Sequence, residues 1–339
     1  MKNSARYYLT NNRIKLAYMA GIFFLALSAV MGIVLGSTSV TFSEIAEVFT
    51  KGTDSVAGRI ILYVRLPRAL AAIVCGAALA VSGAVIQGVL ANRLASPSII
   101  GVNSGAGLAV TLCTALGVLG GWQLSLFSFL GAFLTVMIVS LGAKKWGASR
   151  GTVILMGVAI NSLLGAVSDA VITFIPNVGV MSNDFKIGEF SGVTYQRLVP
   201  VACIIAVSVV LVLSMHNELD VLTLGEENAK GLGMNTPFMR TLFLLFAALL
   251  AGCAVSLAGL LSFVGLIVPH AVRRMAGSRS IHLLCLCAVF GGAFVCFCDT
   301  LARSIFTPYE IPVGIIMAFL GAPFFLFVLF KGKGGYEND

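Results

Sequence analysis

Charged and amide side chains that lie within long apolar runs are the first candidates for chemistry in this sequence. Asp299 and Arg303 are four residues apart, so on a helix they can pair on one face, which makes two charges tolerable inside a membrane. Asp169 lies alone in another apolar run. Because an intramembrane carboxylate usually faces the bundle interior or a water-filled cavity, Asp169 either lines a pathway or bonds a neighbouring helix. Gln87 and Asn161 have the same two interpretations.

The motifs of common enzymes are missing from the sequence. It has no G-x-x-x-x-G-K-[ST] phosphate loop, no nucleophile elbow and no H-E-x-x-H helix, which indicates that the chain neither binds ATP by itself nor acts as an enzyme. Its eight cysteines all lie inside apolar runs, and no histidine stands at zinc-ligand spacing. We interpret these cysteines as small buried hydrophobic residues. The sequence thus predicts no catalytic residue, no metal site and no cofactor.

The elements that position the polar residues are predicted membrane spans. Of the 339 residues, 58% are hydrophobic and 11% are charged, whereas a soluble domain has about 25% charged residues. A spanning helix needs about 20 apolar residues, and the candidate runs are residues 16–36, 69–91, 98–119, 122–143, 152–175, 198–214, 239–272, 281–306 and 312–330. The run 239–272 is too long for one pass and contains Ser256, Gly259 and Gly265, so it predicts two short helices. The prediction is one all-α transmembrane domain over residues 1–339, a polytopic bundle of about ten spans.

The basic residues set the predicted orientation. The net charge of +8 could indicate nucleic acid, but in a membrane protein Lys and Arg mostly report orientation. Six of them lie outside the first and last spans, which places both ends in the cytoplasm and requires an even number of spans: Lys2, Arg6, Arg13, Lys15, Lys331 and Lys333. Residues 37–64 and 176–197 then form outer loops. We expect the chain in the cytoplasmic membrane of a bacterium, in contact with lipid and with no nucleic-acid partner.

Three arginines depart from this orientation bias. Arg65 and Arg68 flank Pro67 at the mouth of the second predicted span, and Arg303 lies near the end of the ninth. The topology brings all three together on the outer face, where we expect them to be exposed. Either their side chains snorkel to lipid headgroups, or their guanidinium forks bind carboxylates of a protein partner.

Small residues recur at every fourth position of the second predicted span. They are Ala72, Gly76, Ala80, Ala84 and Gly88. On a helix they form one slowly drifting stripe against which another helix can pack closely. Such a stripe could also serve packing against a second copy of the chain.

Residues 218–235 form the one sizeable polar stretch on the predicted cytoplasmic side. Apolar residues alternate there with charges in a way that suits two short amphipathic helices, separated near Gly225: Leu219, Leu222, Leu224, Ala229 and Leu232. Helices of this length are too short to be stable alone in water. They therefore need a docking partner.

Several motifs resemble the signature of the FecCD-type permeases, the membrane subunits of type II ABC importers for iron-siderophores, haem and vitamin B12. The family pattern reads roughly R-L-P-R, G-A-A-L-A-x-S-G-x-x-x-Q and N-P-L-A-x-P-x-x-L-G-x-x-x-G-A, and it matches residues 65–68, 76–87 and 92–106. This chain departs from it in having Arg93 where proline is usual and Ile100 where leucine is usual. Further matches extend the resemblance over roughly residues 60–330: F-x-G-L-x-x-P-H-x-x-R at 263–273, E-L-P-x-G at 310–314 and G-A-P-x-F at 321–325.

The resemblance implies a function and a set of partners. A permease of this family forms a translocation pathway with a second permease subunit, as a homodimer or heterodimer. A separate cytoplasmic ATPase dimer powers it, and an extracytoplasmic substrate-binding protein delivers the cargo, most commonly a ferric siderophore. Residues 222–233 match the coupling segment that inserts into a groove on the ATPase, and the matching positions are Leu224, Gly225, Glu226, Glu227, Ala229, Leu232 and Gly233.

The resemblance also implies roles at the two membrane faces. Arg65, Arg68 and Arg303 match arginines that receive glutamates from the two lobes of the binding protein. The turn from Gly147 to Arg150 lies where the family places its cytoplasmic gate, so Ala148 and Ser149 are expected at the pore axis.

An ion-coupled secondary transporter of a small solute is the alternative function. Such a transporter should have intramembrane charges that serve as a coupling site and inverted sequence repeats. Only Asp169 and the pair of Asp299 and Arg303 qualify as such charges, and no convincing repeat is visible. The sequence therefore favours the ABC importer.

Overall fold

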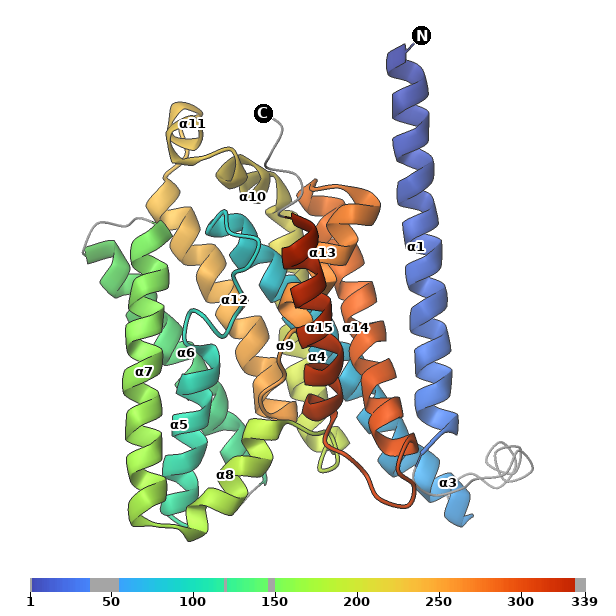
Figure 1. Ribbon diagram of the computed structural model, residues 1–339, viewed down its shortest axis with the longest axis vertical. Coiled ribbons are helices and arrows are strands. Elements are labelled where there is room, and N and C mark those ends of the chain that lie inside the picture. Colours follow the sequence, from blue (N-terminus) through green and yellow to red (C-terminus); the bar gives the residue numbers. More distant parts are fainter. Residues whose placement is uncertain (1, 37–54, 119–120, 146–149, 333–339) are drawn as a thin grey trace.

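The computed structural model describes residues 2–36, 55–118, 121–145 and 150–332 of the chain. These residues form a helical bundle with no β-strand among them (Figure 1), which confirms the predicted all-α class. The helices are α1 (Lys2–Val34), α3 (Val56–Ile60), the π-helical turn η2 (Ile61–Arg65), α4 (Leu66–Val89), α5 (Val102–Ala115), α6 (Gly121–Lys145), α7 (Arg150–Phe174), α8 (Asn177–Ile187), α9 (Tyr195–Ser214), α10 (His216–Thr223), α11 (Glu226–Gly231), α12 (Thr236–Ala258), α13 (Val264–Ala276), α14 (Ser280–Ser304) and α15 (Val313–Gly332).

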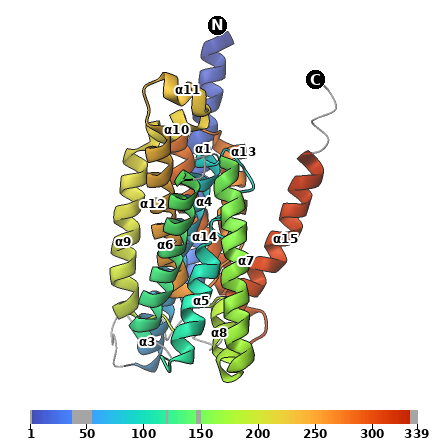
Figure 2. The ribbon, with the colours of Figure 1, turned by 90° about the vertical axis from the view of Figure 1, so that its left-hand side faces the viewer.

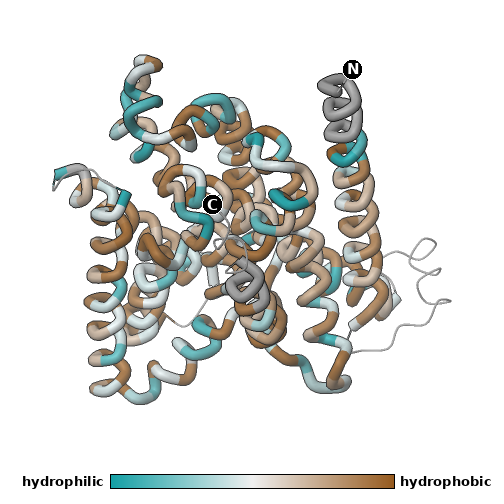
Figure 3. Tube along the Cα trace, turned by 45° about the horizontal axis from the view of Figure 1, so that its top comes forward, coloured by the Kyte–Doolittle hydropathy of each residue, from teal (hydrophilic) through white to brown (hydrophobic). Residues whose placement is uncertain are grey.

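Seven helical stretches of the described chain are long and apolar enough to cross a membrane. They lie in α1, in the continuous stretch from α3 to α4, and in α6, α7, α9, α12 and α14. Two further helices, α5 and α15, are apolar but shorter. Figure 3 shows hydrophobic residues along the helices and hydrophilic residues gathered mainly toward their ends. The chain is therefore a polytopic integral membrane protein.

The two ends of the bundle carry different elements. Helix α1 begins and α15 ends at the same end of the bundle as α10 and α11 (Figure 1). We call this the α10 end. Helices α3 and α8 and the connection 305–312 lie at the opposite end, which we call the α8 end. Figure 2 shows that α15 leans away from the other helices.

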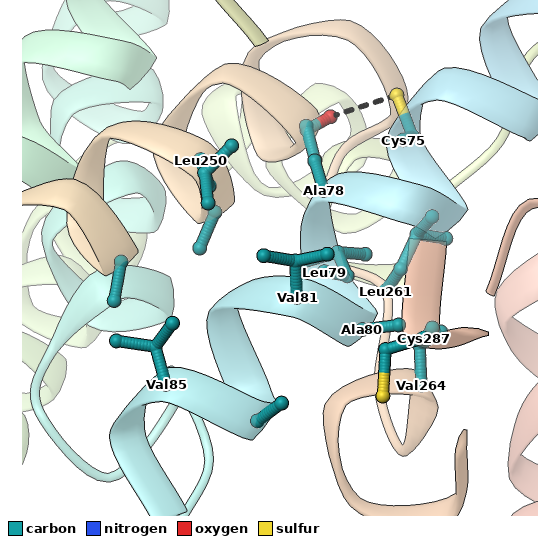
Figure 4. Packing of buried hydrophobic residues seen from close by; sticks show 14 of the residues in the cluster. Cys75, Ala78, Leu79, Ala80, Val81, Val85, Leu250, Leu261, Val264 and Cys287 are labelled. Atoms are coloured by element: carbon teal, nitrogen blue, oxygen red, sulfur yellow. Dashed lines mark hydrogen bonds between the residues drawn. The ribbon is translucent and has the colours of Figure 1, made fainter. Parts of the chain in front are cut away.

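Helix α4 lies at the centre of the bundle and is buried along most of its length. Figure 4 shows Val81 and Val85 of α4 beside Leu250 of α12, and Ala80 beside Cys287 of α14. Because lipid is as apolar as these side chains, close van der Waals packing has to hold the helices together. The central position of α4 means that its polar residues are also fixed by their neighbours.

Glycine pairs let α4 approach two other helices closely. A Cβ atom added at Gly76 would lie 2.2 Å from the carbonyl oxygen of Gly291 in α14, and one added at Gly83 would lie 2.1 Å from that of Gly265 in α13. The small-residue stripe thus packs inside the chain, as the spacing predicts. Gly76 contacts α14 and Gly88 faces Leu219 of α10, so this stripe is covered and does not serve a second subunit.

The run 239–272 divides into two helices, as predicted, but they are unequal. Helix α12 has 23 residues and is long enough to cross a membrane alone, whereas α13 has 13. The division falls at 259–263, where Gly259 and Phe263 have positive φ angles of 71° and 68°. The prediction of two short helices is therefore wrong for the first of them, because Ser256 does not interrupt α12; its hydroxyl bonds the carbonyl of Cys253 instead.

The run 98–119 contains a short helix preceded by a buried turn. Helix α5 has 14 residues, roughly 21 Å of rise, which is less than the ~30 Å hydrocarbon core. Ile100 in the preceding connection is fully buried. Irregular backbone is tolerated at membrane depth only where protein or water satisfies it, and here the side chain of Asn161 does so.

Two other predictions need correction. Cys203 is exposed and Cys285 is half-buried, so the cysteines are not uniformly buried; an exposed thiol on the apolar helix α9 is tolerated because it is weakly polar. The predicted outer loop 176–197 contains the helix α8 and begins α9. Of the predicted loop 37–64, residues 37–54 lie outside the described residues.

Candidate coupling segment and charged outer cluster

The polar stretch 218–235 folds as the sequence predicts, into two short helices. Helix α10 ends at Thr223 and α11 begins at Glu226. Gly225 between them has a φ of 105°, a conformation that glycine adopts at little cost. Helix α11 projects from the bundle beyond the ends of its neighbours (Figure 1).

The apolar residues of this stretch have two different environments. Leu219, Leu222 and Ala229 are buried and attach α10 and α11 to the bundle. Leu224 and Leu232 are 58% and 67% exposed at the α10 end, and the charged residues Glu226, Glu227 and Lys230 lie between them in the sequence. Phe238, two residues into α12, is equally exposed. Leu224, Leu232 and Phe238, which we call the exposed apolar trio, are the natural contact surface for another protein.

Glu226 holds α11 in place by contacts within the chain. Its carboxylate lies 2.9 Å from Nζ of Lys230 and 2.9 Å from Nη2 of Arg240. Hydrogen bonds from Lys230 and then Arg240 keep the pKa of Glu226 below its ordinary value. Arg240 is buried, so Glu226 is its counter-charge, whereas Glu227 is exposed and free of such a role.

A second candidate site lies at the α8 end, where charged residues from three elements meet. Arg68 in α4 contacts Asp299 of α14 at 3.0 Å and Glu310 of the following connection at 2.7 Å. Arg303 contacts the other oxygen of Asp299 at 3.1 Å. We call these four residues the outer charged cluster. The pairing of Asp299 with Arg303 on one helix face is as the sequence predicts.

Arg303, together with Arg65, holds the end of α1. Nη1 of Arg65 donates to the carbonyl oxygens of Ile33 and Val34 at 3.0 and 2.6 Å, and Nη2 of Arg303 donates to that of Gly32 at 2.9 Å. The last carbonyls of a helix lack internal partners and carry partial negative charge. Guanidinium groups are therefore well suited to end α1 here.

The three arginines come together as predicted, but the expectation that they are exposed is wrong. Arg65, Arg68 and Arg303 are only 3%, 6% and 3% exposed. The physical reason is that Asp299, Glu310 and the end of α1 supply acceptors within the chain, so the side chains need not reach lipid or a partner protein. Burial is tolerable because the charges are paired.

Two of the three other polar candidates pack helices. Gln87 donates from Nε2 to the carbonyl of Gly265 at 2.9 Å and accepts from Nη1 of Arg273. Asn161 donates from Nδ2 to the carbonyl of Ser98 at 2.9 Å. Both side chains thus satisfy backbone groups or charges at irregular points of the bundle.

Asp169 does not point into the interior of this chain's bundle but approaches a neighbouring helix, which is one of its two predicted roles. Its side chain is 77% exposed on α7, and one oxygen lies 4.0 Å from Nζ of Lys186 in α8. It stands five residues before the end of α7, where a charge can reach the membrane surface. The predicted gate residues Ala148 and Ser149 lie outside the described residues; Arg150 beside them donates to the carbonyl of Leu222 in α10 at 2.8 Å.

Sequence reasoning did not assign roles to Glu310, Arg240 or Phe238. Glu310 could have been found by asking which carboxylate balances three arginines on the outer face. Arg240 and Phe238 lie just beyond the polar stretch, so a search limited to 218–235 excludes them.

The comparisons with known proteins decide the family. A family model described as "FecCD transport family" matches residues 24–331. The chain belongs to this family. It is 37% identical to the Fe(3+)-citrate import system permease protein YfmD of Bacillus subtilis (strain 168), over 81% of this chain and 82% of that protein. It is 33% identical to the hemin transport system permease protein HmuU of Yersinia pestis, over 95% and 98%.

A solved structure supports the same conclusion. The structure described as an inward-facing conformation of a metal-chelate type ABC transporter matches with a TM-score of 0.83 and 29% identity, covering 94% of this chain and 99% of that one. As a FecCD family member the chain is an ABC transporter permease, and the homologous subunits are not catalytic themselves.

Proposed function

We propose that this permease imports a bulky metal chelate across the cytoplasmic membrane of a bacterium, and that this chelate is a ferric siderophore. Its similarity to permeases named for ferric citrate and for hemin supports this class of cargo. A second permease subunit, identical or related, completes the pathway. The spans number ten, both chain ends are cytoplasmic, and Ala148 and Ser149 line the cytoplasmic gate.

The observation that carries the proposal is the exposed apolar trio at the α10 end. Three large apolar side chains at a hydrophilic end of a membrane protein are costly unless another protein covers them. Leu224 and Leu232 lie in the part of the sequence that resembles an ABC coupling segment. The trio is therefore the docking surface for a cytoplasmic ATPase dimer, which drives transport.

The charges of the described chain argue against the ion-coupled alternative. A coupling site needs an intramembrane carboxylate that can gain and lose a cation. Asp299 is held by two arginines, and Asp169 is exposed near the end of α7. Neither has the environment of a reversible binding site inside the bundle.

An extracytoplasmic binding protein docks at the α8 end in this proposal, and the outer charged cluster defines how. Of the two carboxylates on Arg68, Asp299 is buried, whereas the side chain of Glu310 is 33% exposed. A glutamate of the binding protein can therefore reach Arg68 most readily by displacing Glu310. Arg65 and Arg303 contribute mainly by fixing α1 and Asp299.

The proposed displacement of Glu310 can be tested by measuring the affinity of the binding protein for the permease. Glu310→Gln removes the competing charge, so the binding protein should bind the reconstituted permease more tightly, and salt should weaken that binding. Glu189→Gln, another exposed carboxylate at the same end, is the matched control. Unchanged affinity in Glu310→Gln would mean that Arg68 takes no part in docking.

Uptake into proteoliposomes tests the function as a whole. The permease, reconstituted with its ATPase and binding protein, should accumulate a ferric siderophore only when ATP is supplied. A proton or sodium gradient without ATP should not support uptake. Uptake that follows the ion gradient and ignores ATP would establish the secondary transporter instead, and parallel assays with haem and cobalamin would identify the cargo.

A further inference from the structure

A cavity of about 220 Å³ lies at the α10 end, between α4, α10 and the turn that joins α13 to α14. Its lining residues include Arg93, Arg273, Ser278 and Ser280. No carboxylate lines it. A concave site with two cations, several hydroxyls and no acid is suited to an anion.

Arg273 is held in a fixed position in this cavity. Its Nη1 donates to the side-chain oxygen of Gln87, whose amide nitrogen is in turn fixed by the carbonyl of Gly265 at 2.9 Å. Within the described part of the chain, Arg273 forms no ion pair. A half-buried guanidinium that is positioned by a neutral amide keeps its full charge available to a ligand.

Arg93 adds a second cation that the family pattern does not supply. It is exposed in the turn after α4, at the position where FecCD-type permeases usually have proline. Asp220 accepts from the backbone N–H of Ser280 at 2.9 Å and is not part of the lining. Arg93 therefore makes the cavity of this chain more positive than the family pattern predicts.

We propose that this cavity binds a phosphate group, supplied either by free phosphate or by the headgroup of an inner-leaflet phospholipid. Guanidinium groups bind phosphate oxygens in a bidentate manner. The hydroxyls of Ser278 and Ser280 supply further donors, and the several oxygens of a phosphate match this donor set better than the two oxygens of a carboxylate. The site is independent of the cargo and goes beyond the proposed transport function.

Occupancy of the site would stiffen the coupling segment. Leu219 and Thr223 of α10 line the same cavity as Arg93 and Arg273. A phosphate bound there would join α10 to α4 and to the α13–α14 turn. Phosphate binding would therefore change how strongly α10 is held against α4 and the α13–α14 turn.

The test uses the full chain in phosphatidylcholine nanodiscs. Thr223→Cys places a thiol in the cavity without removing a proposed phosphate donor, in a background with Cys203→Ser, since Cys203 is the exposed cysteine among the described residues. The readout is the rate at which an anionic thiosulfonate reagent modifies the new thiol. Inorganic phosphate should slow this reaction in one arm; phosphatidylglycerol in the nanodisc should slow it without added phosphate in the other. The arm that responds identifies the source of the phosphate group.

Arg93→Gln tests the chemistry, and Arg279→Gln is its matched control. Arg279 is an exposed arginine next to Ser278 that does not line the cavity. Loss of one charge-assisted contact should raise the half-protecting phosphate concentration, or lower the protection by phosphatidylglycerol, roughly 10-fold in Arg93→Gln and leave it unchanged in Arg279→Gln. Equal effects of the two variants, no protection in either arm, or protection that requires the ATPase would each overturn the proposal. Size-exclusion profiles check that both variants are folded.

Discussion

Asp299 is the residue on which the outer charged cluster depends. It is 1% exposed and is shared by Arg68 and Arg303, so its loss leaves two guanidinium groups without their common carboxylate. Breaking a buried ion pair by removing one partner typically costs about 3–5 kcal/mol. We expect Asp299→Asn to lower the thermal unfolding midpoint of the detergent-solubilised permease markedly.

Glu310→Gln is the comparison for Asp299→Asn. Glu310 contacts the same Arg68, but its side chain is partly exposed, and such pairs contribute about 0–1 kcal/mol. The thermal unfolding midpoint of the Glu310→Gln variant should stay close to that of the unmodified chain. Equal midpoints for the two variants would show that Asp299 is dispensable to the fold.

Glu226 gives a pH dependence with a defined sign. Its pKa is lower in the folded chain than its ordinary value of about 4.5, chiefly because of hydrogen bonds from Lys230 and Arg240. The stabilisation is therefore complete above pH 4.5 and is lost as the pH falls through the lowered pKa. The protection factors of the α11 amides, which correct for the intrinsic pH dependence of exchange, should be constant near neutral pH and should fall only in acid.

A comparison of Glu226→Gln with Glu227→Gln separates the effect of protonating Glu226 from the effect of protonating other carboxylates. Glu226→Gln should show low protection factors in α11 at every pH, while Glu227→Gln should follow the unmodified chain. A Glu226→Arg variant would place an arginine against buried Arg240 and detach α11. Loss of ATPase binding in that variant would then reflect a displaced helix as well as a reversed charge.

At the scale of helices, close glycine contacts decide which elements can pack. A Cβ at Gly76 would lie within 2.2 Å of the Gly291 carbonyl, whereas a Cβ at Gly107 in α5 would meet nothing within 4 Å. We expect Gly76→Ala to destabilise the bundle by about 1–3 kcal/mol through overpacking. Gly107→Ala should be neutral or slightly stabilising. Thermal unfolding of the two variants checks this, and equal stability would mean that α4 and α14 can separate freely.

The sequence predicts local features such as a packing stripe or a helix boundary well, but it predicts poorly which other residues and helices contact them. The four-residue spacing from Ala72 to Gly88 identifies a packing stripe, and the glycine near 225 marks the division of α10 from α11. Neither pattern says which helix fills the stripe. Buried Arg68 pairs with Asp299 and Glu310, both more than 200 residues away in the chain, and charge counting along single helices cannot detect these contacts.

Helix α5 illustrates the same limit. Hydropathy predicts a full span over 98–119, but the first part of that run is irregular backbone whose carbonyls are bound by Asn161 of α7. An apolar run in the sequence does not distinguish a helix from a buried turn. The two differ in what satisfies the backbone polar groups, which is the helix itself in one case and a side chain such as that of Asn161 in the other.

At the scale of the molecule, the two ends of the bundle have different surfaces. The α8 end buries its conspicuous arginines in internal ion pairs but leaves Phe306 and Tyr309 exposed, and the α10 end leaves the exposed apolar trio uncovered. The trio lies in and beside a segment of charged residues, where an exposed leucine gains only from a protein partner. This setting supports the proposal that the α10 end receives the energy-supplying subunit.

The decisive prediction concerns this face. Replacing Leu224 and Leu232 together by Gln should leave the permease inserted and monodisperse, because both side chains are exposed and contribute little to the fold. Each leucine buried at an interface is worth about 1.5–3 kcal/mol, so affinity for the ATPase should fall about 100-fold or more. Leu116→Gln, at a leucine after α5 that is 83% exposed, is the control and should bind the ATPase normally. Co-purification of the ATPase with the double variant at the unmodified level would show that α10 and α11 are not its docking site, and the proposed coupling role of residues 218–235 would be withdrawn.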